Sequence, residues 1–275
     1  MTGLSDNKLK NLLNAVPPGA LVDSKWFKRH NIADSTYHDY AQRGWLVRLA
    51  RGVFLRPDPA FDPHQPLKWT TVVASMHQIM AIPFHVGGMS ALNLRGLGHY
   101  IPMQEPAHIN VYAPKLPGWL AKLNTDARLI HRRLSLFSDP DLGVEPLKSA
   151  GLSFGIAASF PVASPERAIL EAIDDLPEGA GFEQLDLVFQ GLVNLSPRKL
   201  TRLLRDCQRV KVVRLFFVFA DRHGHAWLKH LDQTGLKFGH GDRQLVANGK
   251  IHPRYRITVP SQWVVRDKDD DKASM

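Results

Sequence analysis

Four prolines stand within ten residues, from Pro57 to Pro66, and they divide this chain of 275 residues into two unequal parts. Proline fixes φ and lacks an amide hydrogen, so such a segment continues neither a helix nor an inner strand. The chain is also long for one compact domain and comfortable for two. We therefore expect one domain at 1–57, a stiff linker at 58–66, a second domain at 67–263 and a disordered tail at 264–275.

Composition excludes several classes of protein. Hydrophobic residues make up 44% of the chain and charged residues 22%, which is typical of a globular protein. A single cysteine, Cys207, excludes an intramolecular disulfide framework and a zinc site with several cysteines. No apolar run approaches the roughly 18 residues of a membrane span, and the N-terminus has no apolar signal core. We expect a cytoplasmic protein without a membrane partner.

The net charge of +9 is unevenly distributed along the chain. Residues 25–56 carry +5, residues 57–138 carry +3, residues 139–194 carry −8 and residues 195–266 carry +11. A basic excess favours an anionic partner, although it says nothing about the fold. Two basic blocks on either side of an acidic one predict distinct surfaces with distinct partners.

The first basic block has the order of elements of a winged helix-turn-helix. Leucines at helical spacing end before Pro17, a second helix starts at Asp23 or Ser24, and a third runs from about residue 34 to Gly44. Two β-type runs follow at 45–49 and 52–55, with a tight basic tip between them. The sequence therefore predicts three short helices followed by a basic hairpin, or wing.

This module carries side chains suited to DNA. A recognition helix needs short polar and hydrogen-bonding groups near its start, and cations at its end and on the wing can neutralise phosphates. The alternative is that the aromatic residues form the core and the arginines a solvated face. The candidate DNA-binding residues are Ser35, Thr36, Tyr37, His38, Tyr40, Arg43, Arg48 and Arg51.

The second part of the chain mixes helices and strands. Helices are expected at 69–80 and 88–98, and alternating residues predict neighbouring strands at 107–113 and 128–132. Ser164-Pro165 and Ser196-Pro197 each place a capping serine before a proline at the first helical position. Strand and helix both remain open for 210–220, a short helix is expected around Trp227, and 243–259 predicts a hairpin. The fold class is α+β, with a mixed α/β second domain.

Arginines line one face of the helix that begins at Pro197. Arg198, Arg202, Arg205 and Arg209 fall within an arc of roughly 60°, opposite the leucines. Such a stripe favours an anionic partner, but it could also pair with the acidic block at 139–194. Lys211 and Arg214 follow directly and are counted with this candidate surface.

Three patterns suggest catalysis or cofactors, and each has a simpler explanation. The glycines at 88–98 lack the spacing of a dinucleotide fingerprint. Asp174-Asp175 fits a solvated helix end better than a carboxylate pair. His223, His225 and His230 lack a carboxylate or cysteine at ligand spacing. We therefore expect no catalytic residue, no metal and no cofactor.

Several segments together resemble one family, the AbiEi antitoxins, from about residue 6 to residue 263. The C-terminal segments are the more specific, because many winged helices share the first. The segments are RGVF at 51–54, GMSAL at 88–92, SPERA at 164–168, VKVVRLF at 210–216, HGHAW at 223–227 and GKIHPRYRITVP at 249–260.

The resemblance implies a bifunctional antitoxin of a type IV toxin–antitoxin system, linked to abortive phage infection. Its N-terminal winged helix would bind inverted repeats in the system's own promoter and repress it. Its C-terminal antitoxin domain would counteract a nucleotidyltransferase toxin of the AbiEii family, with or without a stable complex. No catalytic residue comes with the family.

Two other functions remain as alternatives. One is a ligand-responsive winged-helix transcription factor without a toxin, which would hold a small-molecule pocket within 67–263. The other is an enzyme acting on nucleic acid. Against the enzyme stand the lack of a phosphate-cradling loop, of a nucleotidyltransferase motif and of a nucleophile–base pair in the sequence.

Overall fold

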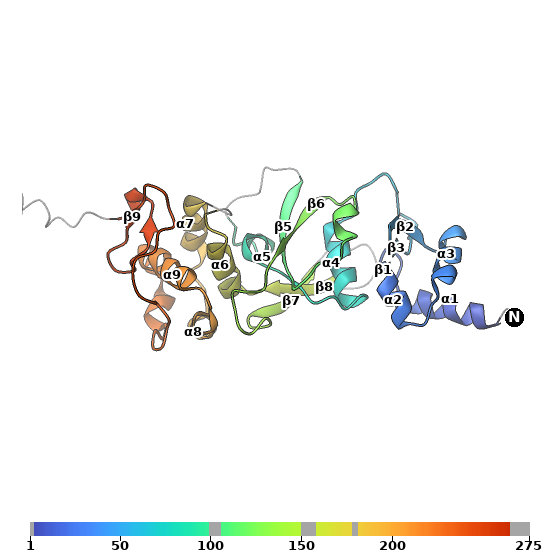
Figure 1. The fold of residues 1–275 in the computed structure, drawn as a ribbon, viewed down its shortest axis with the longest axis horizontal. Helices are drawn as coiled ribbons and strands as arrows, with labels where there is room; N and C mark the ends of the chain where they lie inside the picture. Colours follow the sequence, from blue (N-terminus) through green and yellow to red (C-terminus); the bar gives the residue numbers. More distant parts are fainter. Residues whose placement is uncertain (1–2, 99–105, 150–157, 178–180, 265–275) are drawn as a thin grey trace, which may run out of the picture. The chain divides into compact units, whose positions relative to one another are not determined.

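The computed structural model describes residues 3–98, 106–149, 158–177 and 181–264, and it shows an α+β protein (Figure 1). The chain forms two compact units. The first contains residues 1–86, 102–133 and 145–162, and the second contains the rest. Residues 58–66 hold turns and no helix or strand, yet the N-terminal module clusters with the sheet that follows. Most of the expected disordered tail, from residue 265 on, lies outside the described residues.

The N-terminal module has the expected helices and hairpin, with one additional strand. Its elements are α1 (Gly3–Ala15), β1 (Leu21–Asp23), α2 (Ser24–Arg29), α3 (Asp34–Gln42), β2 (Val47–Ala50) and β3 (Val53–Leu55). The strands form an antiparallel sheet in the order β1-β3-β2. The strand β1 was not expected, because three residues before a helix carry too short a pattern to identify a strand.

Local signals fix the turns of this module. The Asp23 carboxylate caps α2 by accepting the amide hydrogen of Trp26 at 2.8 Å. Gly52 stands at the wing tip with φ +82°, a left-handed conformation in which other residues are strained. The sequence offered Asp23 or Ser24 as the cap, and the structure shows that it is Asp23. The tight tip of the wing is as predicted.

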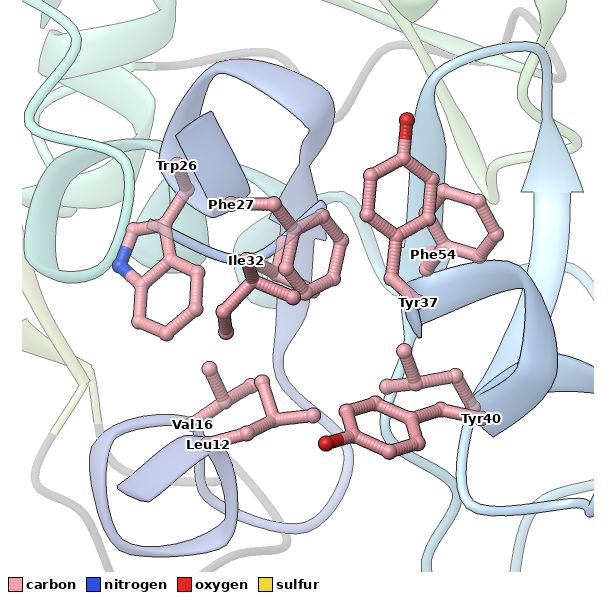
Figure 2. Packing of buried hydrophobic residues seen from close by; sticks show 10 residues of the cluster. Leu12, Val16, Trp26, Phe27, Ile32, Tyr37, Tyr40 and Phe54 are labelled. Atoms are coloured by element: carbon pink, nitrogen blue, oxygen red, sulfur yellow. The ribbon is translucent and has the colours of Figure 1, made fainter. Parts of the chain in front are cut away.

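The core of the module is aromatic. Leu12, Val16, Trp26, Phe27 and Ile32 pack in one buried cluster with residues from α3 and β3 (Figure 2). This cluster holds the three helices against the small sheet, because each helix contributes at least one side chain to it.

A mixed five-stranded sheet makes up the rest of the first unit, with the strand order β6-β5-β4-β8-β7. The expected neighbours at 107–113 and 128–132 are confirmed as β5 and β6, which pair in parallel. The strands β4, β7 and β8 were not expected, since β4 is only two residues long and prolines interrupt the other two. The elements are α4 (Trp69–Gln78), β4 (His85–Val86), β5 (Ala107–Tyr112), a 3-10 turn (Leu120–Lys122), β6 (Ala127–Arg132), β7 (Val144–Ser149) and β8 (Ala158–Ala163).

Hydrogen bonds join the N-terminal module to α4. The Leu21 amide donates to the Ser75 hydroxyl at 3.0 Å, and this hydroxyl donates to the Thr71 carbonyl at 2.8 Å. The Arg29 guanidinium donates to the Met80 carbonyl at 2.6 Å, just past the end of α4. Buried polar groups that are all satisfied in this way hold two segments in one arrangement.

The second unit is mainly helical. Its capped helices start where the sequence predicted, because Ser164 and Ser196 each accept an amide hydrogen from the first turn that follows. Residues 210–220 are helical, which settles that choice, and the hairpin is confirmed in the pairing of β9 with β10. The elements are α5 (Gly88–Leu94), α6 (Pro165–Asp174), α7 (Phe182–Gly191), α8 (Pro197–Asp206), α9 (Val210–His223), two 3-10 turns (Ala226–His230 and Ser261–Trp263), β9 (Lys250–Ile251) and β10 (Thr258–Val259).

A buried ion pair organises the start of this unit. The Arg167 guanidinium donates to the Glu171 carboxylate at 2.7 Å, and both side chains are almost fully buried. Arg167 also donates to the carbonyls of Pro140 and Leu142, while Glu171 accepts the amide hydrogen of Gly88. Such a pair is tolerated because neighbouring groups satisfy its remaining hydrogen-bonding capacity. In the described residues, no helix is long and apolar enough to cross a membrane.

Candidate functional site

The third helix, α3, has one buried and one polar face. Ser35, His38 and Gln42 are exposed and lie at i, i+3 and i+7, so they form one stripe along the helix. The half-buried Thr36 lies beside this stripe. A polar stripe on a short exposed helix is the form in which side chains reach base edges in a DNA groove.

Tyr37 and Tyr40 do not belong to this face, which corrects their assignment as candidate DNA contacts. Their exposed fractions are 4% and 3%. Tyr37 stacks on Phe27 at 4.5 Å between ring centroids and packs edge-on against Phe54 at 5.2 Å (Figure 2). Burial is the main cause that raises the pKa of Tyr37, and a hydrogen bond with Asp34 raises it further. Both tyrosines therefore position α3 from inside the core.

The three candidate arginines of the module are all exposed. Arg43 forms an ion pair with Asp39 at 3.0 Å on the surface of α3, an arrangement that contributes little to stability in water. Arg48 on β2 and Arg51 at the wing tip form no ion pair with a described residue. Their charges are therefore available to an anionic partner.

Two exposed residues of this module were missed by the sequence analysis. Gln42 completes the polar stripe of α3, and its spacing from Ser35 and His38 was a usable signal. Trp45 is 45% exposed between α3 and β2, which is unusual for so large a ring. Its position inside a β-type run concealed it.

The second basic surface is smaller than the sequence suggested. Arg198 and Arg202 on α8 are exposed, and neither forms an ion pair or hydrogen bond with a described residue. Leu200, Leu203 and Leu204 are buried on the other side of this helix. The amphipathic arrangement expected for α8 is therefore present, with free cations in its first half.

The second half of the stripe pairs within the unit. Arg205 donates to the Asp232 carboxylate at 2.5 Å, and Arg209 donates to Asp174 at 2.9 Å. Lys211 donates to the Asp174 carbonyl at 2.7 Å, at the C-terminal end of α6 where a cation is favourable. Asp174 belongs to the acidic block at 139–194. Arg209 and Lys211 therefore pair with this block, whereas Arg198 and Arg202 do not.

Arg214 leaves the candidate surface altogether. It is 3% exposed and donates to the carbonyls of Phe238, Gly241 and Arg256 at 2.7 to 2.8 Å. Burial lowers the pKa of its guanidinium. A buried arginine that binds three carbonyl groups supports the fold and cannot reach a partner molecule.

The histidines of the C-terminal part have local structural roles. His223 contacts the Asp186 carboxylate at 2.8 Å, and His225 contacts the Phe189 carbonyl at 2.6 Å. Trp227 donates from its indole nitrogen to the Leu192 carbonyl at 2.7 Å, which anchors the short helix expected there. Across the described ranges, no three histidine, cysteine or acidic side chains are placed to share a metal ion.

The chain is similar along nearly its whole length to a solved structure. The crystal structure of the RV2827C protein from Mycobacterium tuberculosis covers 97% of this chain and 95% of its own, with a TM-score of 0.54 and 15% sequence identity. This similarity shows a shared fold. Among curated proteins, none matches the chain.

Two family models match in sequence order. The first, described as the N-terminal domain of the AbiEi antitoxin transcriptional regulators, matches residues 5–103. The second, described as a transcriptional regulator, AbiEi antitoxin, of type IV toxin–antitoxin systems, matches residues 107–260 and so covers more than half of the chain. Neither is an enzyme family, and the descriptions imply DNA and a toxin as partners. The chain belongs to the AbiEi antitoxin family of transcriptional regulators.

Proposed function

We propose that the chain represses its own promoter by binding inverted repeats through the N-terminal module, and that it counteracts a nucleotidyltransferase toxin of the AbiEii family through its C-terminal domain. One observation supports promoter binding: the module has both an exposed polar stripe on α3 and, on the adjacent wing, arginines without an ion-pair partner among the described residues. Both activities take place in the cytoplasm, where the promoter is.

The two groups of residues have different tasks in this proposal. Ser35, His38 and Gln42 read base edges, because hydroxyl, imidazole and amide groups offer the donors and acceptors that the major groove matches. Arg48 and Arg51 bind phosphates and fix the orientation of the module on the duplex. Arg43 joins them once DNA draws it away from Asp39, since an exposed pair is weak.

Fluorescence anisotropy with a promoter fragment tests the first half. The wild-type chain binds a fragment with intact inverted repeats more tightly than one with scrambled repeats. Replacing Gln42 by Ala reduces this preference by about tenfold, the equivalent of roughly 1.4 kcal/mol for one base contact. The matched control, Arg128→Gln on β6, removes an exposed charge outside the module and leaves both affinities unchanged. Equal affinity of the wild type for both fragments contradicts the proposal.

Toxin neutralisation rests on family membership and on the free cations of α8. Arg198 and Arg202 are exposed, close in sequence and unpaired among the described residues, so they provide a positive surface for an anionic partner. Arg205, Arg209 and Lys211 border this surface but already have carboxylate or carbonyl partners. Arg198 and Arg202 therefore carry this part of the proposal.

Co-expression with a nucleotidyltransferase toxin of the AbiEii family tests this second half. The double variant Arg198→Glu/Arg202→Glu fails to restore growth but still binds the promoter. The control Lys250→Glu, an exposed cation on β9, neutralises the toxin as the wild type does. Full rescue by the double variant, at wild-type protein levels, removes these arginines from the proposal.

A further inference from the structure

A hollow of about 740 Å³ lies within the first unit, beside the wing. Three separate segments form its walls. They are the start of α2 with the wing tip, the loop 80–83 that follows α4, and the loop 114–119 that follows β5. Its volume falls within the range of pockets that hold small molecules.

The walls of the hollow are fixed by hydrogen bonds. Arg29 binds the Met80 carbonyl at 2.6 Å, and the Ile82 amide donates to the Met76 carbonyl at 2.9 Å. On the opposite side, the Ser24 amide donates to the Gly52 carbonyl at 2.9 Å and joins α2 to the wing tip. A ligand would therefore meet a site that is already formed, which lowers the entropy lost on binding.

The lining combines apolar surface with positive charge. Met80, Ile82, Pro83, Leu116 and Trp119 supply most of the apolar part of the lining. Four cationic residues line the hollow against a single carboxylate. This combination favours a molecule with an apolar body and a negative group.

Three of the four cationic side chains at the hollow have no partner among the described residues. The one carboxylate, Asp23, is 4% exposed and already accepts the amide hydrogen of Trp26. Lys25, Arg51 and Lys115 are exposed, and none forms an ion pair or hydrogen bond with a described residue. A cationic ligand would find no free acceptor carboxylate here, whereas an anion would find three unpaired cations.

We propose that this hollow binds an organic anion with an apolar body, such as an aryl sulfonate, phosphate or carboxylate. Because Arg51 lines the hollow and also lies at the wing tip, the bound anion weakens promoter binding. This second consequence rests on the function proposed above, whereas the binding of the anion does not. A DNA phosphate is the competing occupant, but it has no use for the apolar walls.

The test uses the full chain without DNA and the fluorescent probe 8-anilinonaphthalene-1-sulfonate, which joins aromatic rings to a sulfonate. The expected result is saturable binding of one probe molecule per chain. The double variant Lys25→Gln/Lys115→Gln binds the probe about tenfold more weakly, because it loses two charged contacts. Leu116→Ser, which keeps every charge, also weakens binding. The control Lys122→Gln, an exposed lysine outside the lining, binds as the wild type does.

Several results overturn the proposal. One is equal affinity of the wild type and the Lys25→Gln/Lys115→Gln variant, provided that both unfold at the same temperature. Another is displacement of the probe by inorganic phosphate as readily as by unlabelled naphthalene sulfonate, which would mean that the apolar walls do not take part. A third is unchanged affinity for the probe in Leu116→Ser, which would likewise leave the apolar walls without a role. All three measurements are made without promoter DNA. They therefore remain interpretable even if the chain does not bind its promoter.

Discussion

At the scale of single residues, burial separates two kinds of arginine that look alike in the sequence. Arg202 on α8 is exposed, whereas Arg214 on α9 lies in the core and binds three carbonyl oxygens. Removing a charge from the first changes what a partner meets. Removing the second leaves three carbonyl groups without the donor that joins them, and that cost falls on the fold.

Arg214→Met is expected to lower the free energy of unfolding by about 2–3 kcal/mol, because the carbonyls of Phe238, Gly241 and Arg256 lose their donor. The measurement is urea unfolding followed by circular dichroism. Arg202→Met serves as the control and changes stability by less than about 0.5 kcal/mol. Equal stability of the two variants would show that Arg214 does not support the fold.

Cys207 is expected to be chemically inert in the native protein. Its side chain is 2% exposed, and burial raises the pKa of the thiol to about 11. Only the thiolate reacts with disulfide reagents, so little reactive species exists at pH 8. Reaction with 5,5′-dithiobis(2-nitrobenzoate) is therefore negligible in buffer and complete in guanidinium chloride. Rapid reaction of the folded chain would contradict the burial of Cys207.

At the scale of elements, one carboxylate joins two helices of the second unit. Asp186 on α7 accepts from Arg222 at 3.1 Å and contacts His223 at 2.8 Å, both at the end of α9. Burial alone would raise the pKa of Asp186, but the hydrogen bonds from Arg222 and His223 outweigh it and hold the pKa below 3.8. The charged carboxylate is thus favoured by folding.

Since folding lowers this pKa, the stabilisation is present above pH 3.8 and is lost as the pH falls further. Asp186→Asn is expected to lower the free energy of unfolding by about 1 kcal/mol at pH 7, a modest value because the pair is partly exposed. The difference from the wild type narrows as the pH approaches 3. Urea unfolding at both pH values measures it, with Glu183→Gln on the same helix as control. A difference that does not change with pH would rule out this linkage.

Elements with local signals were predictable, and elements that depend on distant partners were not. Ser164-Pro165 and Ser196-Pro197 located the starts of α6 and α8 because a cap acts within four residues. The strand β1 forms only through pairing with β3, thirty residues later in the chain. Prolines interrupt the sequences of β7 and β8, so neither is recognisable as a strand from its own residues. Each is stabilised by pairing with a neighbouring strand.

The sequence indicated which elements carry exposed candidate residues, but not which of the candidate side chains are exposed. The cations of the wing were identified correctly as exposed, while Tyr37 and Tyr40 proved to be core. Arg214 carried a usable signal, because it is the one charged residue in the apolar run from Val212 to Ala220. Whether a charge points outward depends on which face of a helix packs, and that is decided by residues far away in the sequence.

At the scale of the whole molecule, the net charge of +9 does not identify which cations are free. Arg209 and Lys211 interact with Asp174, and Arg205 pairs with Asp232, so these C-terminal cations are held by partners within their own unit. The wing keeps its charge unpaired. The proposed DNA binding therefore depends on a small number of cations in the N-terminal module.

The dependence of promoter binding on salt counts these cations directly. Each phosphate contact contributes about 0.9 to the slope of log K against log salt concentration, so Arg48→Gln/Arg51→Gln should make the slope shallower by about 2. Arg128→Gln should leave it unchanged. We expect this difference in slope between the two variants on the promoter with its inverted repeats intact. An unchanged slope in the double variant, with the chain folded, would contradict the central claim that the N-terminal module holds the DNA through its wing.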